Sequence, residues 1–154
     1  MSNTAIWNSA LSYTTALSTE LNSLAAGSVA VAATAIDNTT ALNTDGWVSV
    51  SLPTVATGAG APSLDVYLLP LNQDGTTYGD GTATGTLLPG GAYYVGSVTW
   101  AASLASGTQT GSLYIASGIP PTKFKLAVVN NIGNALAASG NVVAFASDKL
   151  NLNG

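Results

Sequence analysis

Hydrophobic and polar residues alternate with a period of two along most of this chain. The alternation begins at Val29 and continues, with interruptions, to Phe145. Successive side chains of a β-strand point to opposite faces, so this pattern predicts strands with one buried and one solvated face. The alternating segments cover residues 29–36, 47–52, 64–69, 93–100, 113–115, 123–128 and 143–145.

The interruptions are short runs of Gly, Pro, Asn and Asp, which favour turns. They include Asp45-Gly46, Asp74-Gly75, Asp80-Gly81 and Pro89-Gly90-Gly91. The longest is residues 101–111, which are rich in Gly, Ser and Thr and which we expect to form an exposed loop. Seven or eight short strands at this spacing predict an all-β fold. The expected architecture is a jelly-roll-like antiparallel β-sandwich, with a small barrel as the alternative.

The N-terminal segment has a different period. Its apolar residues recur every three or four positions, which is one stripe of an α-helix. The stripe consists of Ile6, Ala10, Tyr13, Leu17, Leu21 and Leu24. Ser and Thr are abundant there and disfavour helix interiors, so both a helix, best over Thr15–Leu24, and an extended arm remain open. The sequence therefore predicts an arm at residues 1–28 and a β-sandwich domain at residues 29–154.

The chain carries few charged residues. Of its 154 residues, 3 are Lys and 7 are Asp or Glu, which gives a net charge of −4. The sequence contains no Arg, His or Cys. So few cations cannot neutralise a series of phosphates, which excludes nucleic-acid binding. Without His and Cys, the common zinc sites, thiol nucleophiles and Ser-His-Asp triads are excluded as well. No apolar run reaches the roughly 18 residues of a membrane span, so we expect no membrane partner, and no motif indicates a cofactor.

The carboxylates allow two kinds of site. Asp65 and Asp80 could serve as the acid and base of a glycoside hydrolase. Asn72, Asp74 and Asp80 could surround Ca²⁺, although their spacing does not match an EF-hand loop. Asp in such contexts more often supplies the hydrogen bonds of a turn. We therefore predict no catalytic residue, no metal ligand and no enzymatic activity.

The aromatic residues allow a binding surface. Trp and Tyr can stack on sugar rings, but they also lie at the margins of cores and at interfaces with one polar end satisfied. The candidates for a ligand-facing platform are Trp47, Tyr67, Tyr78 and Trp100. The core or interface interpretation is preferred, and the sugar platform is the alternative.

The low charge itself indicates an assembled protein. A surface of Ser, Thr, Asn, Gly and Ala does little to repel a neighbouring copy, whereas soluble monomers carry more charge. We expect the N-terminal segment to make the contacts, because a detachable arm suits a subunit of a large assembly. The predicted contact residues are Ile6, Trp7, Tyr13, Leu17, Leu21 and Leu24. Truncation before Leu24 would then abolish particle binding and leave the sandwich folded.

Several segments occur in an order that resembles a known family. They are Glu20–Ala25, Ala35–Thr40, Leu64–Pro70, Asp74–Gly81, Ile119–Lys125 and Val129–Asn141. Together they are similar to small virion structural proteins of tailed bacteriophages, a family associated with head decoration, or cement. The resemblance spans residues 15–145 and rests on turn and strand motifs.

The resemblance implies a jelly-roll-like sandwich and a structural role with no active-site residues. Such a protein would bind the major capsid protein and copies of itself, as a dimer or trimer, and would stabilise the shell. Its location would be the virion, assembled in the cytoplasm of the host bacterium. The alternative is a carbohydrate- or receptor-binding β-sandwich on a tail or head fibre.

Overall fold

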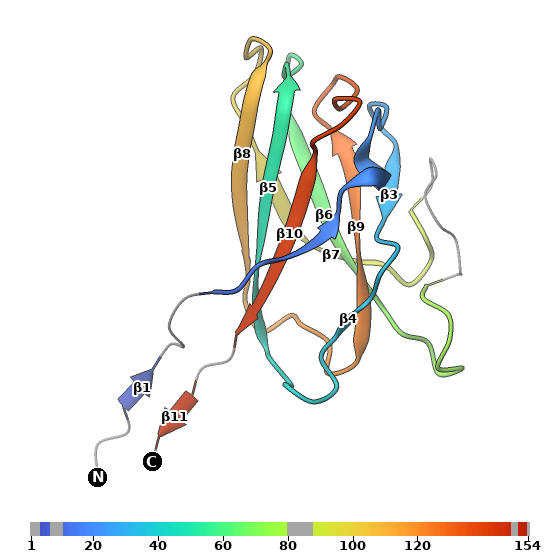
Figure 1. Cartoon of the computed structure of the whole chain (residues 1–154), viewed down its shortest axis with the longest axis vertical. Helices are drawn as coiled ribbons and strands as arrows, with labels where there is room; N and C mark the ends of the chain where they lie inside the picture. Colours follow the sequence, from blue (N-terminus) through green and yellow to red (C-terminus); the bar gives the residue numbers. More distant parts are fainter. Residues whose placement is uncertain (1–3, 7–10, 80–87, 149–150, 154) are drawn as a thin grey trace.

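Two antiparallel β-sheets face each other across one hydrophobic core (Figure 1). The structure is a computed structural model, and it describes residues 4–6, 11–79, 88–148 and 151–153. No helix within these ranges is long and apolar enough to cross a membrane. The predicted all-β sandwich is confirmed.

The order of the strands in the two sheets defines the topology. The first sheet contains, in spatial order, β2 (Thr14–Leu17), β10 (Val142–Asp148), β5 (Asp45–Val55) and β8 (Gly107–Ile115). The second contains β3 (Val29–Val31), β9 (Lys123–Asn131), β6 (Ser63–Pro70) and β7 (Tyr93–Thr99), and the short β4 (Ile36–Asp37) also pairs with β9. The two sheets contain eight strands when β4 is set aside. If these eight are numbered 1 to 8 in chain order, starting from β2, the first sheet has the order 1-8-3-6 and the second has the order 2-7-4-5. This interleaved order is that of a jelly roll.

The period of two explains which side chains form the core. In β5, Val48 and Val50 are buried between the sheets, and in β6 Leu64 and Val66 face them from the opposite side. Phe124 of β9 and Phe145 of β10 meet edge to face, with ring centroids 5.5 Å apart. Full burial of one such aliphatic side chain stabilises the fold by about 1.5–3 kcal/mol.

A smaller cluster covers half of the second sheet on its outer side. Leu69 and Ala127 are buried there together with Val29 and Val31. Loop residues that follow β6 and precede β7 pack over them, namely Tyr78, Leu88 and Ala92. The strand β3 is therefore buried on both faces, and the rest of this outer face remains open.

The residues between 11 and 24 form part of the sandwich, and of the two alternatives left open for this segment the helix is wrong. Thr14–Leu17 pairs with β10 as β2, and Thr19–Leu21 is a single 3-10 turn, η1. Leu17 and Leu21 are fully buried, because the strand directs Leu17 inward and the turn brings Leu21 back to the same core. The β-branched Thr residues favour the extended conformation. The predicted boundary at residue 28 thus falls inside the sandwich.

Glu20 ties this turn to the following strand. Its Oε2 accepts a hydrogen bond from the Ser18 N–H at 3.1 Å, and its Oε1 accepts one from the Ala33 N–H at 3.0 Å. Partial burial by itself would raise the pKa of Glu20. The backbone hydrogen bonds have the larger combined effect, so the pKa of Glu20 lies below its usual value.

The terminal strands stand apart from the sandwich. β1 (Thr4–Ile6) and β11 (Asn151–Asn153) pair only with each other, antiparallel, with Thr4 opposite Asn153. They project from one end of the molecule (Figure 1). The separate element is therefore shorter than the predicted arm, and it combines a segment from the N-terminal region with one from the C-terminal region.

β8 begins earlier than predicted. The expected loop at residues 101–111 ends at Gly107, where β8 starts and pairs with β5. Alternation between small polar residues carries no hydrophobic signal, so the first half of this strand could not be recognised from the sequence pattern.

Candidate functional site

The four aromatic residues predicted to face a ligand lie in three separate places, because only Tyr67 and Tyr78 pack against the same cluster. Trp47 is on the outer face of the first sheet, and Tyr67 is on the outer face of the second. Tyr78 lies in the loop that covers the second sheet, with the Lys125 Nζ 5.1 Å from its ring centroid. Trp100 follows β7 at the edge of the sandwich. They do not form one platform.

Trp100 has a structural position. Its indole Nε1 donates a hydrogen bond to the Thr110 carbonyl oxygen at 3.0 Å, and its ring packs against the core. A side chain at Gly111 would collide with Val98 and touch the Trp100 ring, so glycine is needed there. Trp100 thereby covers part of the outer edge of β8, where unpaired backbone groups would otherwise be exposed.

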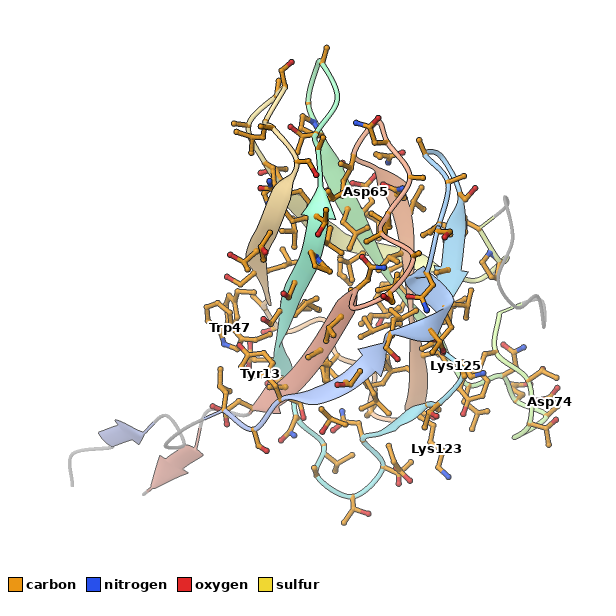
Figure 2. All side chains as sticks on the ribbon, turned by 45° about the horizontal axis from the view of Figure 1, so that its top comes forward. Tyr13, Trp47, Asp65, Asp74, Lys123 and Lys125 are labelled. Carbon is orange, nitrogen blue, oxygen red and sulfur yellow. The ribbon has the colours of Figure 1, made fainter. Side chains whose placement is uncertain are left out.

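The outer face of the first sheet carries no charged residue along its central rows. We call this surface the uncharged face. It consists of Tyr13 (Figure 2), Thr15, Trp47, Ser49, Ser51, Thr108, Thr110, Ser112, Tyr114, Val142 and Ala144. All four strands contribute to it, because the residues that alternate with the core positions point outward.

One end of the uncharged face is aromatic. Trp47 and Tyr114 are cross-strand neighbours with ring centroids 4.9 Å apart. Tyr13, 43% exposed, lies at the same end of the molecule as Trp47, beside the terminal strands (Figure 2). Cross-strand aromatic pairs of this kind stabilise a sheet and present a large contact area.

Asp45 fixes this aromatic end. Its carboxylate accepts hydrogen bonds from the Thr44 hydroxyl at 2.6 Å, the Ser117 N–H at 3.0 Å and the Tyr114 hydroxyl at 2.9 Å. These donors hold the pKa of Asp45 below its usual value of 3.8, and the hydrogen bond to Asp45 raises the pKa of Tyr114. Asp45 and its cross-strand partner Asp148 are both largely buried, and they border the aromatic end of the uncharged face.

We predict that Asp45→Asn lowers stability at pH 7 by about 1–2 kcal/mol, because the amide replaces a charged acceptor of several hydrogen bonds. The folded-state pKa of Asp45 is depressed. Its stabilising contribution is therefore present above the unfolded pKa and is lost as the pH falls through the folded pKa. Urea unfolding at pH 7 and near pH 2.5 measures both effects. The difference in the free energy of unfolding between wild type and Asp45→Asn should be smaller near pH 2.5 than at pH 7. An equal difference at both pH values would contradict this account.

The open half of the second sheet carries a different surface. Asp65 Oδ1 accepts hydrogen bonds from the Ser63 hydroxyl at 2.9 Å and the Ser97 hydroxyl at 2.6 Å, and Oδ2 accepts one from the Asn131 amide at 2.7 Å. Tyr67 and Tyr94 lie beside this cluster as a cross-strand pair, with ring centroids 5.4 Å apart. We call these six residues the polar-aromatic face.

Sequence reasoning identified part of this face. Asp65 and Tyr67 stand two positions apart in the alternating segment 64–69, so the sequence pattern puts them on the same face of one strand. Ser97 and Asn131 lie 32 and 66 residues from Asp65 along the chain, and the pairing of β7 and β9 with β6 brings them to it. No local pattern could have indicated those two residues.

The turn interpretation is confirmed for Asp74. Asp74 Oδ1 accepts hydrogen bonds from the N–H groups of Thr76 and Thr77, and the Thr77 hydroxyl also donates to Asp74. These bonds lower the pKa of Asp74 to about 2. Asp80 lies outside the described residues. Within the described part of the chain, no group of three or more His, Cys, Asp or Glu residues could hold a metal ion.

The predicted contact residues of the N-terminal segment have different environments. Leu17 and Leu21 are core residues, and Leu24 is half-buried against the core, so these three cannot form a contact surface. The Tyr13 side chain is exposed. Ile6 belongs to β1, and Trp7 lies outside the described residues.

A groove of about 350 Å³ lies between β2, β10 and β4. Phe145 and Ile36 line it together with small residues, and Asp37 lies at its margin. Asp37 is already engaged by the Thr39 hydroxyl at 2.6 Å and by the Lys123 Nζ at 3.5 Å. The groove therefore combines small apolar side chains with Ser and Thr hydroxyl groups, and its one carboxylate is already engaged.

The fold and its surfaces define a jelly-roll β-sandwich whose two outer faces differ in chemistry. No protein-family model, no curated protein and no solved structure matches the chain.

Proposed function

We propose that this chain is a non-enzymatic structural protein of a bacteriophage virion. In this role it decorates the capsid, bridges neighbouring copies of the major capsid protein and stabilises the shell. The jelly-roll topology is consistent with the proposal, because jelly rolls recur in viral capsid domains as well as in lectins. The family resemblance of the sequence points in the same direction.

The uncharged face carries the proposal. The centres of protein interfaces are depleted of charged residues and enriched in Tyr and Trp, and the strongest contributors cluster there. The uncharged face combines an aromatic end, Trp47 and Tyr114, with rows of Ser, Thr and Ala. Repetition of one modest contact over a symmetric shell would give strong attachment through multivalency.

The terminal strands extend the same contact. An isolated two-stranded ribbon is marginally stable in water. β1 and β11 lie at the end of the molecule that carries Tyr13 and Trp47 (Figure 2), so a neighbouring chain bound at the aromatic end could also pair with them. This refines the predicted attachment element, which now excludes the buried Leu17 and Leu21.

The direct experiment is to count copies of this chain in purified particles of the phage that encodes it. Quantitative mass spectrometry should give a ratio to the major capsid protein that is near one, or a simple fraction of it. A handful of copies per particle would move the protein to the tail, neck or a fibre. Complete absence from particles would overturn the proposal.

A charge placed on the uncharged face should abolish attachment. We predict that Ser49→Lys, in the middle of β5, prevents binding to heads that lack the protein, because binding would bury an unpaired ammonium group. Gln73→Lys adds the same charge to an exposed loop and serves as the matched control. Co-sedimentation with heads measures binding, and melting temperatures check that both variants fold. Normal decoration by Ser49→Lys would rule out this face as the contact.

A further inference from the structure

The polar-aromatic face is a second surface that the structural role does not use. It lies on the opposite sheet from the uncharged face, on β6, β7 and β9. We propose that this face binds a neutral glycan, in addition to the proposed structural function and independently of it.

The two tyrosines provide a stacking surface. Tyr94 is 56% exposed, and its hydroxyl lies 2.6 Å from the Ser97 Oγ, which restrains the ring. Tyr67 is half-buried, and its ring packs against the covered cluster that contains Leu69 and Ala127. A pyranose ring has an apolar face of C–H groups that packs on such an aromatic surface, while its hydroxyls remain free for polar contacts.

Asp65 provides the directed polar contact. Its three hydrogen bonds, from Ser63, Ser97 and Asn131, hold the carboxylate in place before any ligand arrives. A carboxylate offers about four acceptor positions, so one at Oδ2 remains for a sugar hydroxyl. Hydrogen bonds to an ionised acceptor are stronger than neutral ones. Little side-chain entropy is lost on binding, because the network is already ordered.

The charge of this face favours a neutral ligand. Asp65 is its one charged residue, and it would repel a phosphate, sulfate or uronate group. Lys125 lies over the Tyr78 ring, on the covered half of the sheet, and its ammonium is not directed to Asp65 (Figure 2). A protein partner would require an apolar centre without charge, which this face lacks. The combination of exposed ring, fixed carboxylate and amide therefore fits a neutral sugar best.

Affinity electrophoresis of the full chain tests this proposal. Native gels would contain dextran, mannan, xylan or galactomannan as neutral probes, and alginate as an acidic one. The net charge of −4 drives migration, so binding to an immobile polymer appears as retardation. We expect retardation by at least one neutral polymer and none by alginate. Tyr94→Ala and Asp65→Asn should each weaken binding at least about tenfold, and Tyr94→Phe, which keeps the ring, should weaken it less.

Tyr13→Ala is the matched control, because it removes an exposed tyrosine from the other sheet. Its retardation should equal that of the wild type, and melting temperatures check the fold of every variant. The proposal is overturned if no neutral polymer retards the wild type, if alginate alone does, or if Tyr94→Ala and Asp65→Asn are retarded as strongly as the wild type. Absence of the chain from phage particles would refute the structural role without affecting this result.

Discussion

A chain that lacks residues 1–24 is expected to remain unfolded at 25 °C, whereas a chain that lacks residues 1–10 should fold. The longer deletion removes β2 and the fully buried Leu17 and Leu21, and it exposes the margin of β10. Replacement of one buried Leu by Ala typically costs 2–5 kcal/mol. The loss of two such side chains and a strand therefore approaches the 5–15 kcal/mol that stabilises a whole domain.

Circular dichroism and thermal melting of the two truncated chains would measure this difference. Leu17→Ala in the full chain provides a graded control, with an expected loss of about 2–5 kcal/mol. A cooperative melt of the chain without residues 1–24, at a temperature close to that of the full chain, would show that this segment is a dispensable arm. The shorter deletion also separates attachment from folding, because it removes β1 and leaves the core intact.

Asn130→Ala should destabilise the protein by about 3–5 kcal/mol, an unusually large effect for a polar residue. Asn130 is completely buried in β9. Its Nδ2 donates to the carbonyl oxygens of Leu24 and Asn134, both at 2.9 Å, and its Oδ1 accepts from the Ile132 N–H at 3.1 Å. Alanine would leave the Asn134 carbonyl and the Ile132 N–H without this partner, whereas the Leu24 carbonyl keeps the Leu136 N–H at 3.0 Å. Each buried unsatisfied group costs about 1–3 kcal/mol.

The neighbouring Asn131 gives a matched control for this substitution. Asn131 is exposed, and its side chain donates to Asp65, so Asn131→Ala should cost no more than about 1 kcal/mol. Urea unfolding at pH 7 would measure both variants. Equal losses for the two would mean that the buried amide of Asn130 contributes no more than a surface hydrogen bond.

The strands were predictable where burial on one face alternates with exposure on the other. β5, β6 and β9 follow this rule, and their core positions, such as Val48 and Leu64, could be named from the sequence. The structure of the N-terminal segment could not be predicted from the sequence. The spacings of four and three between Leu17, Leu21 and Leu24 fit an α-helix, but they also fit a strand followed by a 3-10 turn. Tertiary packing decides between these two structures, and the spacing of residues along the chain carries no information about that packing.

The two candidate surfaces were predictable to different degrees. Composition indicated a protein with an unusually uncharged surface, but only the strand order placed Trp47, Ser49 and Ser112 on one sheet face. The contacts of Asp65 likewise depend on strand pairing over long sequence distances. A local pattern identifies which side chains point away from the core. The topology of the strands determines which of these side chains contact one another.

The position of both termini has a practical consequence for engineering this protein. β1 and β11 leave from one end, whereas the connections at residues 56–62 and 100–106 lie at the opposite end (Figure 1). A tag fused to either terminus would be placed at the proposed attachment site and would compete with it. A foreign peptide inserted into one of the distal connections would instead point away from the particle, which makes these loops the suitable positions for multivalent display.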